Sequence, residues 1–268
     1  MAQKDCPVCQ GTGWKLVEVE GIKRAQRCGC GLARRPVDLL LRSRIPPRYE
    51  HCTLANFALR KDAATGSVNG YLERAKSDAG FFVREYPNVD CGLVFTGPTG
   101  VGKTHLAVAV LRGLIERGFD CLFVDFRELL QQIRESYDPV ADTTELRLLQ
   151  PVIETEVLLL DELVAANPND WLKERLAYII NARYNQKKVM LITTTLAFGD
   201  AGRAPLGRGA SSDGRMPSGD AIPSLERSLD EFGVTLSSRL YEMCKPIEIR
   251  AHDFRKEVKQ AGYRFYAD

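Results

Sequence analysis

The stretch that decides the fold of this chain is Gly97-Pro-Thr-Gly-Val-Gly-Lys-Thr104. It matches the pattern G-x-x-x-x-G-K-[ST], in which a glycine-rich loop turns backbone N–H groups around a polyphosphate. An apolar run, Leu93-Val-Phe95, precedes the loop, and an amphipathic helical stretch begins near His105. Because the positive end of that helix dipole would face the same anion, this order of strand, loop and helix predicts a nucleotide-binding site.

Two side chains at the end of the loop have predicted roles in binding ATP and Mg²⁺. Lys103 would reach the β- and γ-phosphates, and Thr104 would offer its hydroxyl to Mg²⁺. A chance glycine-rich turn before a helix is the alternative, but the flanking strand and helix favour nucleotide binding. We therefore expect ATP to contact Gly97, Pro98, Thr99, Gly100, Val101, Gly102, Lys103, Thr104 and His105.

A second motif, at residues 157–162, is the apolar run Val-Leu-Leu-Leu followed by two acids. A buried parallel strand places its last residue at the carboxyl edge of the sheet, where α/β folds bind ligands. Asp161 would hold Mg²⁺ there, and Glu162 would orient the water that attacks the γ-phosphate. An isolated run of this kind often ends in a plain exposed acid. Paired with the upstream phosphate loop, it predicts hydrolysis of ATP and not binding alone.

Two further candidates follow along the chain. The strand-like residues 189–195 end in three threonines, a strand end of the kind that carries a polar sensor of the γ-phosphate in additional-strand ATPases. Threonine is also common in strands for its β-propensity alone. Arg239 lies on an expected helix around 237–244, where it is a candidate arginine finger for a neighbouring subunit's γ-phosphate. The alternative for Arg239 is a surface residue whose stem covers apolar neighbours.

Four of the eight cysteines cluster near the start of the chain: Cys6, Cys9, Cys28 and Cys30. In a chain without a recognisable export signal, such a cluster favours metal over disulfides. Four thiolates could close a tetrahedral structural Zn²⁺ site. Residues 14–19 and 22–27 are expected to form two strands joined by a turn, so the sequence predicts a small zinc ribbon. Reduced cysteines without metal are the alternative.

Composition and charge bound the class of protein. The 268 residues are 44% hydrophobic and 27% charged, which is ordinary for a globular protein. No apolar run approaches the roughly 18 residues of a membrane span, and we find no secretion signal, so we expect a cytoplasmic location without membrane contact. Residues 1–48 carry ten Lys/Arg against four Asp/Glu. This basic N-terminus could favour DNA or an acidic protein face, and a solvated basic surface is the alternative.

The chain is expected to divide into a zinc-ribbon-like module at 1–33, a connector at 34–69 and an ATPase domain at 70–268. A short helix at 37–43, ending before two prolines, would form part of the connector. Residues 201–219 contain ten Gly, Ser or Pro, and a stretch so poor in apolar side chains cannot order itself. We expect a flexible insertion at about 201–222, either an inert loop or a contact to DNA through its arginines.

In combination, these motifs resemble the AAA+ ATPases of the DnaC-type helicase-loader and IstB-type transposition-helper family. Four stretches carry the resemblance: residues 97–107, 157–162, 171–184 and 238–244. It covers roughly residues 45–256, and the cysteine module resembles the zinc-binding extension of some loaders. The resemblance implies an α/β fold with a parallel sheet in strand order 5-1-4-3-2, flanked by helices. It also implies ATP-dependent self-association, with the active site shared between subunits.

The resemblance also assigns roles to particular residues. It implies that residues 126–150 form an extra helical element, which faces single-stranded DNA in loaders. It places Lys103 and Thr104 on phosphate and Mg²⁺, and it implies Asp161 on Mg²⁺, Glu162 on water and Arg239 acting in trans.

Two positions depart from the family pattern. Thr195 stands where the sensor is often Asn, and Val164 stands where the loop after the acid pair often has Gly. Threonine still hydrogen-bonds phosphate, so the first departure would weaken sensing without abolishing it. The second has no consequence that the sequence explains.

The leading hypothesis is an ATPase that loads or remodels a replicative helicase on DNA, with the cysteine module docking the partner. A transposition-helper ATPase that acts with a transposase is the closest alternative. A third is a binding module regulated by nucleotide, with negligible turnover. A small-molecule P-loop kinase is disfavoured by Glu162 and by the block around Arg239, and a GTPase by the absence of an N-K-x-D guanine motif.

Overall fold

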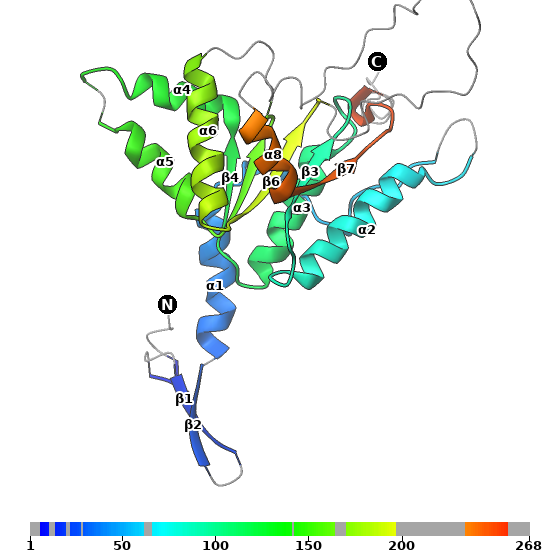
Figure 1. Cartoon of the computed structure of the whole chain (residues 1–268). Helices are drawn as coiled ribbons and strands as arrows, with labels where there is room; N and C mark the ends of the chain where they lie inside the picture. Colours follow the sequence, from blue (N-terminus) through cyan, green and yellow to red (C-terminus); the bar gives the residue numbers. More distant parts are fainter. Residues whose placement is uncertain are drawn as a thin grey trace, which may run out of the picture.

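The structure, a computed structural model, describes residues 6–10, 14–19, 22–27, 29–61, 66–140, 142–163, 170–196 and 234–256. The expected insertion at 201–222 and the family departure at Val164 lie outside these residues. The described chain forms a five-stranded sheet between layers of helices, and a two-stranded hairpin joined to that core by a helix (Figure 1).

The five-stranded sheet is parallel throughout, in the order β4-β5-β6-β3-β7. Its strands are β3 (Gly92–Thr96), β4 (Cys121–Asp125), β5 (Val157–Asp161), β6 (Val189–Thr194) and β7 (Cys244–Glu248). Numbered from β3 as the first strand, this is the order 5-1-4-3-2. The fold-class prediction is confirmed, since strands that are distant in sequence, such as β3 and β7, pair as the resemblance implied.

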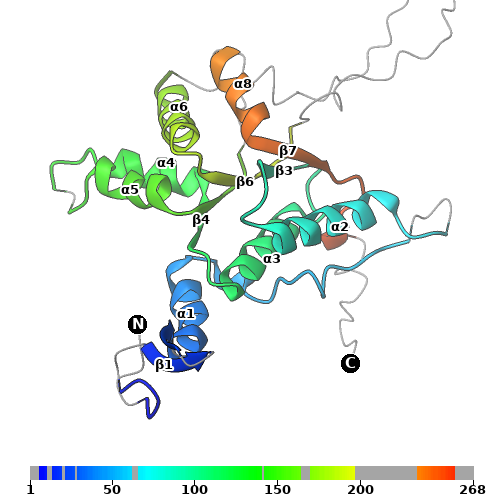
Figure 2. The same cartoon turned by 60° about the horizontal axis from the view of Figure 1, so that its bottom comes forward.

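Helices connect these strands. They are α1 (Gly29–Arg42), η1 (Pro47–Tyr49), α2 (Gly70–Glu85), α3 (Lys103–Glu116), α4 (Phe126–Glu135), α5 (Glu145–Glu154), α6 (Asp170–Asn185) and α8 (Val234–Met243). Figure 2 shows α2 and α3 on one face of the sheet, and α6 and α8 on the other.

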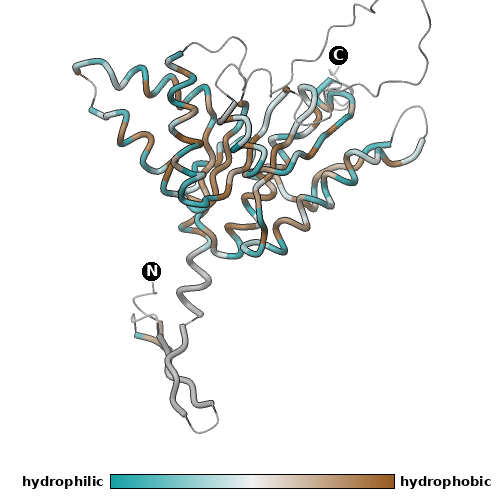
Figure 3. Tube along the Cα trace, viewed as in Figure 1, coloured by the Kyte–Doolittle hydropathy of each residue, from teal (hydrophilic) through white to brown (hydrophobic). Residues whose placement is uncertain are grey.

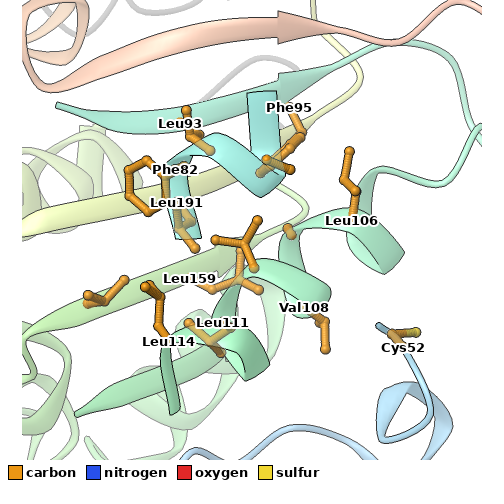
Figure 4. Packing of buried hydrophobic residues seen from close by; sticks show 14 of the residues in the cluster. Cys52, Phe82, Leu93, Phe95, Leu106, Val108, Leu111, Leu114, Leu159 and Leu191 are labelled. Carbon is orange, nitrogen blue, oxygen red and sulfur yellow. The ribbon is translucent and has the colours of Figure 1, made fainter. Parts of the chain in front are cut away.

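Alternate residues of each strand belong to different hydrophobic clusters. Leu159 packs with α2 and α3, and Figure 4 shows it beside Leu111 and Leu114 of α3. Its neighbour Leu158 packs on the opposite face, with α6 and α8. A strand covered on both faces is apolar along its whole length, which explains the uninterrupted apolar runs in the sequence. Figure 3 shows these hydrophobic residues gathered in the sheet. In the described part of the chain, none of the helices combines the length and the hydropathy that a membrane span needs.

The extra helical element begins without a loop at the end of β4. Asp125, the last residue of β4, is the N-cap of α4, and its Oδ1 accepts hydrogen bonds from the N–H groups of Arg127 and Glu128 at 2.9 and 3.0 Å. Such a cap satisfies donors that the helix itself cannot bond. As a result, the first turn of α4 lies at the carboxyl edge of the sheet, next to the end of β5.

The N-terminal hairpin has the strands that the sequence predicted. β1 (Trp14–Val19) pairs antiparallel with β2 (Ile22–Arg27). α1 then begins at Gly29, well before the helix expected at 37–43, and it includes Pro36. Proline removes one helical hydrogen bond without ending the helix here. The end of α1 is fixed to the core, because Ser43 O accepts a hydrogen bond from Phe123 N at 2.7 Å.

Arg183 on α6 is fully buried and bonds only to backbone oxygens among its described hydrogen-bond partners. Its guanidinium donates to the carbonyls of Val152, Ile153, Thr155, Glu156 and Val189. These carbonyls lie at the end of α5 and near the starts of β5 and β6. Burial lowers the pKa of Arg183 to about 10, so the side chain stays charged at neutral pH. One cation therefore joins three elements at the edge of the sheet opposite the phosphate loop.

Replacing Arg183 with Met should lower the free energy of unfolding by about 3 kcal/mol, because buried carbonyl groups would lose their donors. Urea or thermal unfolding of the full chain measures the change. Arg147→Met is the matched control, since it makes the same substitution at an exposed position on α5. Equal stability of Arg183→Met and the unmodified chain would contradict this role.

Candidate active site at the carboxyl edge of the sheet

The predicted phosphate loop joins β3 to α3. Gly97, Gly100 and Gly102 have backbone φ angles of 139°, 80° and 105°, a region that residues with side chains rarely adopt. Gly102 is the N-cap of α3, whose first N–H groups have no partners within the helix. The loop and the first turn of α3 therefore form a backbone cradle of the kind that binds phosphate.

Two distant segments pack directly on this loop, and glycine permits their approach. A Cβ on Gly100 would lie 1.9 Å from Asp253 Oδ1, and a Cβ on Gly102 would lie 2.9 Å from Phe57 Cε2. The N–H of Phe254 also donates to Gly100 O at 3.0 Å. The loop is therefore held between the segment that follows β7 and the segment that follows α1.

Lys103 lies within the cradle. Its Nζ donates to Gly97 O at 2.8 Å and to Pro98 O at 2.7 Å. Burial lowers the pKa of Lys103 to about 8, while the nearby Asp161 and Glu162 oppose the shift. The ammonium group is therefore mostly charged at neutral pH, and it lies against the loop that is predicted to bind phosphate.

Asp161 ends β5 and is buried. Its Oδ1 accepts hydrogen bonds from Thr104 Oγ1 at 2.9 Å and from Thr193 Oγ1 at 2.6 Å. Burial raises the pKa of Asp161, and these two hydrogen bonds oppose the rise. A hydroxyl and a carboxylate are hard oxygen donors, the ligands that Mg²⁺ prefers. The two residues predicted to hold Mg²⁺ are thus in direct contact, and their chemistry fits that ion.

Glu162 follows Asp161 with a left-handed backbone, at φ 55°. This conformation is uncommon for a residue with a side chain, and it turns the chain sharply at the end of β5. Its N–H donates to Thr193 Oγ1 at 3.0 Å. Its side chain is 54% exposed, and Oε2 lies 4.0 Å from Nε of Arg127 on α4. The carboxylate is therefore accessible from the cavity, while its backbone is fixed.

The threonines at the end of β6 have different positions. Thr193 is buried and bonds to both acids of the pair, whereas Thr195, the predicted sensor, is exposed and lines the cavity. Thr194 Oγ1 donates to Leu163 O at 2.6 Å. Sequence reasoning missed Thr193, although the run of hydroxyls at a strand end was visible. The sensor role of Thr195 stays a prediction.

A cavity of about 560 Å³ opens over the phosphate loop, within the usual range for small-molecule sites of about 300–1,000 Å³. Its cations are Arg48, Arg60, Lys103, Arg127 and Arg255. Glu162 is the acid that lines it among the described residues. An excess of cations around a phosphate cradle fits a polyanionic ligand. The four arginines come from the linker after α1, from α4 and from the segment after β7, so no local motif identifies them.

His105 faces the linker after α1. Its Nε2 lies 3.0 Å from Asn56 Oδ1 and 3.3 Å from Thr53 O. Both are acceptors, so Nε2 carries the proton and donates. Its ring meets Phe57 edge-on at 5.4 Å between centroids, and burial lowers its pKa, which favours the neutral form. His105 lines the cavity, and its described contacts fix one wall of it.

The predicted zinc ligands are only partly described. Cys6 and Cys9 are both buried in a turn, where Gln10 N donates to Cys6 O at 2.8 Å. Cys28 and the side chain of Cys30 lie outside the described residues. Within the described part of the chain, no group of three or more metal-binding side chains comes together. The zinc site therefore stays a prediction.

Arg239 lies on α8 and is not among the described residues that line the cavity of its own chain. Its guanidinium contacts Asn181 and the ring of Tyr184, both on α6. The structure thus brings together the phosphate loop, Asp161 and Glu162, but not Arg239. The role of Arg239 in a neighbouring subunit's site stays a prediction.

The fold and the site together define the class of protein. A phosphate loop follows the first strand, an acid pair ends the third, and an additional strand lies between the two in the sheet. This is the arrangement of a P-loop ATPase of the AAA+ class.

Comparison with known proteins narrows the class. The family described as IstB-like ATP binding protein matches residues 76–205. The replicative helicase loader DnaC of Escherichia coli strain K12 is 25% identical over 147 residues, which cover 55% of this chain and 56% of that protein. An ATP-binding protein of insertion sequence IS5376 from Geobacillus stearothermophilus is 30% identical over 112 residues, or 41% of this chain and 42% of that protein.

Solved structures agree with the sequence matches. The crystal structure of the DnaC helicase loader is similar with a TM-score of 0.57 and 28% identity, covering 76% of this chain and 100% of that one. These similarities together support a DnaC/IstB-type AAA+ ATPase. It spans about half the length of the curated relatives that it matches.

The lowered pKa of Lys103 predicts a pH dependence of nucleotide affinity. Nucleotide phosphates favour the protonated ammonium, so affinity should be full below pH 8 and should weaken as the pH rises through about 8. Titration of Mg²⁺–ATP from pH 7.5 to 9.5 measures this, because the phosphates are already ionised throughout that range. An affinity that stays constant across this range would contradict the assignment of Lys103.

Proposed function

We propose that this protein binds ATP with Mg²⁺, hydrolyses it when subunits assemble, and uses this cycle to load or remodel a replicative helicase on DNA. The observation that carries the proposal is the hydrogen-bonded set of Thr104, Asp161 and Thr193, next to Glu162, in a cavity rich in arginine. The similarity to DnaC, described as a replicative helicase loader, supports the choice of partner.

In the proposed nucleotide complex, Lys103 exchanges the carbonyls of Gly97 and Pro98 for the β- and γ-phosphates. The N–H groups of the loop and of the first turn of α3 bind the remaining phosphate oxygens. Thr104 and Asp161 would hold Mg²⁺, which would supply positive charge to the phosphates of the nucleotide. Arg255 is close enough to the loop to add positive charge there, since it contributes to lowering the pKa of Lys103.

Glu162 is the proposed water-orienting residue. Its backbone is fixed by Thr193, and its exposed carboxylate accepts a proton from the attacking water. As the water oxygen bonds to the γ-phosphorus, the bond to the β–γ bridging oxygen breaks, giving ADP and phosphate. Arg239 of a neighbouring subunit stabilises the charge on the transferring group, and Thr195 senses the γ-phosphate. Hydrolysis then depends on assembly.

The extra helical element, α4 and α5, is the proposed contact to single-stranded DNA. Arg127 and Arg134 on α4 and Arg147 on α5 are all exposed. Nε of Arg127 also lies 4.0 Å from Oε2 of Glu162, so DNA that binds this arginine would change the charge next to the water-orienting carboxylate. This placement supports hydrolysis that responds to DNA.

A transposition helper is the second candidate, and two observations favour it. The matching family is described as IstB-like, and the relative from an insertion sequence is 30% identical over the region that it covers. In that case the partner is a transposase. A nucleotide-regulated binding module with negligible turnover is the third candidate function. The roles of Glu162 and Arg239 distinguish it from an ATPase, since the proposed hydrolysis depends on both residues.

We also propose that the N-terminal cysteines hold a structural Zn²⁺ and that their module docks the partner. The burial of Cys6 and Cys9 in one turn supports the first half of such a site. The hairpin projects beyond α1, away from the sheet, which leaves it accessible to another protein (Figure 1).

Replacing Glu162 with Gln should lower the rate of ATP hydrolysis about 100-fold or more, while nucleotide binding is retained, because the amide cannot accept the proton. The assay uses the full chain with Mg²⁺–ATP and single-stranded DNA. Glu116→Gln, an exposed position at the end of α3, is the matched control. Unchanged turnover in Glu162→Gln would favour a binding module over an ATPase.

A pull-down with ATP distinguishes the partners. The full chain should capture a replicative helicase, and a chain that starts at Gly29 should not. The deletion ends there because Leu39 and Ile45 belong to the hydrophobic core and must be kept. Capture of a transposase would support the transposition helper instead. Capture that does not depend on residues 1–28 would contradict the docking role of the module.

Metal analysis of the purified chain should find Zn²⁺, and Cys6→Ser should reduce both the zinc content and the capture of the partner. Cys91→Ser is the control, since it lies outside the module. A full chain that purifies without zinc and docks normally would refute the metal site.

A further inference from the structure

The guanidinium of Arg239, on α8, is held by two side chains of α6. Its Nη1 donates to Asn181 Oδ1, and its Cζ lies 5.0 Å from the centroid of the Tyr184 ring. The two helices pack through a shared hydrophobic cluster that includes Ile180 of α6 and Leu240 of α8. The contact therefore joins an arginine on one helix to a platform on its neighbour, and Figure 2 shows α6 and α8 together on one face of the sheet.

Both partners of Arg239 are neutral. Among the described residues, no carboxylate lies within the 4.0 Å that defines an ion pair with Arg239. Glu242, one turn along α8, is bonded elsewhere, because it accepts a hydrogen bond from Tyr184 OH at 2.9 Å. That bond and the charge of Glu242 raise the pKa of Tyr184, so the phenol remains a donor at neutral pH. Within the described part of the chain, no carboxylate therefore neutralises the positive charge of Arg239.

We propose that Tyr184 and Asn181 are positioning residues, which hold Arg239 in place to enter the ATP site of a neighbouring subunit. The inference rests on the proposed function, in which Arg239 acts in trans. An arginine side chain has many rotamers, and a group that is already oriented loses less entropy when it meets the transition state. Neutral partners orient the guanidinium without using up the charge that stabilises the transferring phosphoryl group.

Mixtures of full-length subunits test this directly. A Lys103→Ala subunit keeps Arg239 but has a defective site, and an Arg239→Ala subunit has an intact site but no finger. Neither should hydrolyse ATP efficiently alone, and mixing them should restore turnover. Adding Tyr184→Ala to the Lys103→Ala subunit should then lower the restored kcat about tenfold to a hundredfold, with KM for ATP unchanged. Tyr184→Phe, which keeps the ring, should retain most of the rate.

Two further arms separate positioning from damage to the fold. If Tyr184→Ala is placed on the Arg239→Ala subunit instead, the restored kcat should not fall, because that subunit has no arginine at position 239 to hold in place. Tyr178→Ala on the Lys103→Ala subunit is the matched control, since Tyr178 is an exposed tyrosine on the same helix. Asn181→Asp on the Lys103→Ala subunit should also lower the restored kcat, because the new carboxylate would pair with the guanidinium of Arg239 and neutralise its charge.

The outcomes distinguish the inference from the proposal on which it rests. If the unmodified Lys103→Ala and Arg239→Ala subunits fail to restore turnover together, Arg239 does not act in trans and the shared site is refuted. If turnover is restored equally with Tyr or Ala at position 184, the trans site stands and the positioning role is overturned. An equal loss from either placement of Tyr184→Ala would also overturn it.

Discussion

The carboxylate of Asp161 is the point on which the site depends. A buried carboxylate is costly unless hydrogen bonds or a cation compensate for the water that it loses. Here Thr104 at the start of α3 and Thr193 in β6 both donate to it, and Thr193 also accepts from the N–H of Glu162. One charged group therefore fixes the phosphate-loop helix, two strands and the left-handed turn at Glu162 relative to each other. Burial raises the pKa of Asp161 and the two hydrogen bonds oppose that rise, and a bound cation would favour the charged form in the same way.

The cavity around that carboxylate is assembled from distant parts of the chain. The linker after α1 packs Phe57 on Gly102, and the segment after β7 places Asp253 and Phe254 on Gly100. Like charges gathered in one cavity repel each other, so the arginines that line it favour a polyanionic ligand. The linker follows α1, the helix that joins the core to the N-terminal hairpin.

Much of the site was predictable because its residues are local. Lys103 and Thr104 follow the loop directly, and Asp161 and Glu162 end one apolar run, so spacing alone assigns them. Thr193 was harder to choose among three consecutive threonines, since only its neighbours show which hydroxyl meets Asp161. The arginines of the cavity and the contacts of Arg239 with α6 join positions far apart in sequence, and no local pattern records such pairs.

The sequence by itself located the phosphate loop, the strand that ends in the acid pair and the two strands of the N-terminal hairpin, because apolar periodicity and glycine spacing act over a few residues. It misplaced the start of α1, since a proline such as Pro36 can lie inside a helix as well as before one. Only the tertiary structure decided which side chains meet. The burial of Arg183 beneath five carbonyls and the neutral platform under Arg239 arise when separate elements pack, and their energies depend on burial that a linear pattern does not specify.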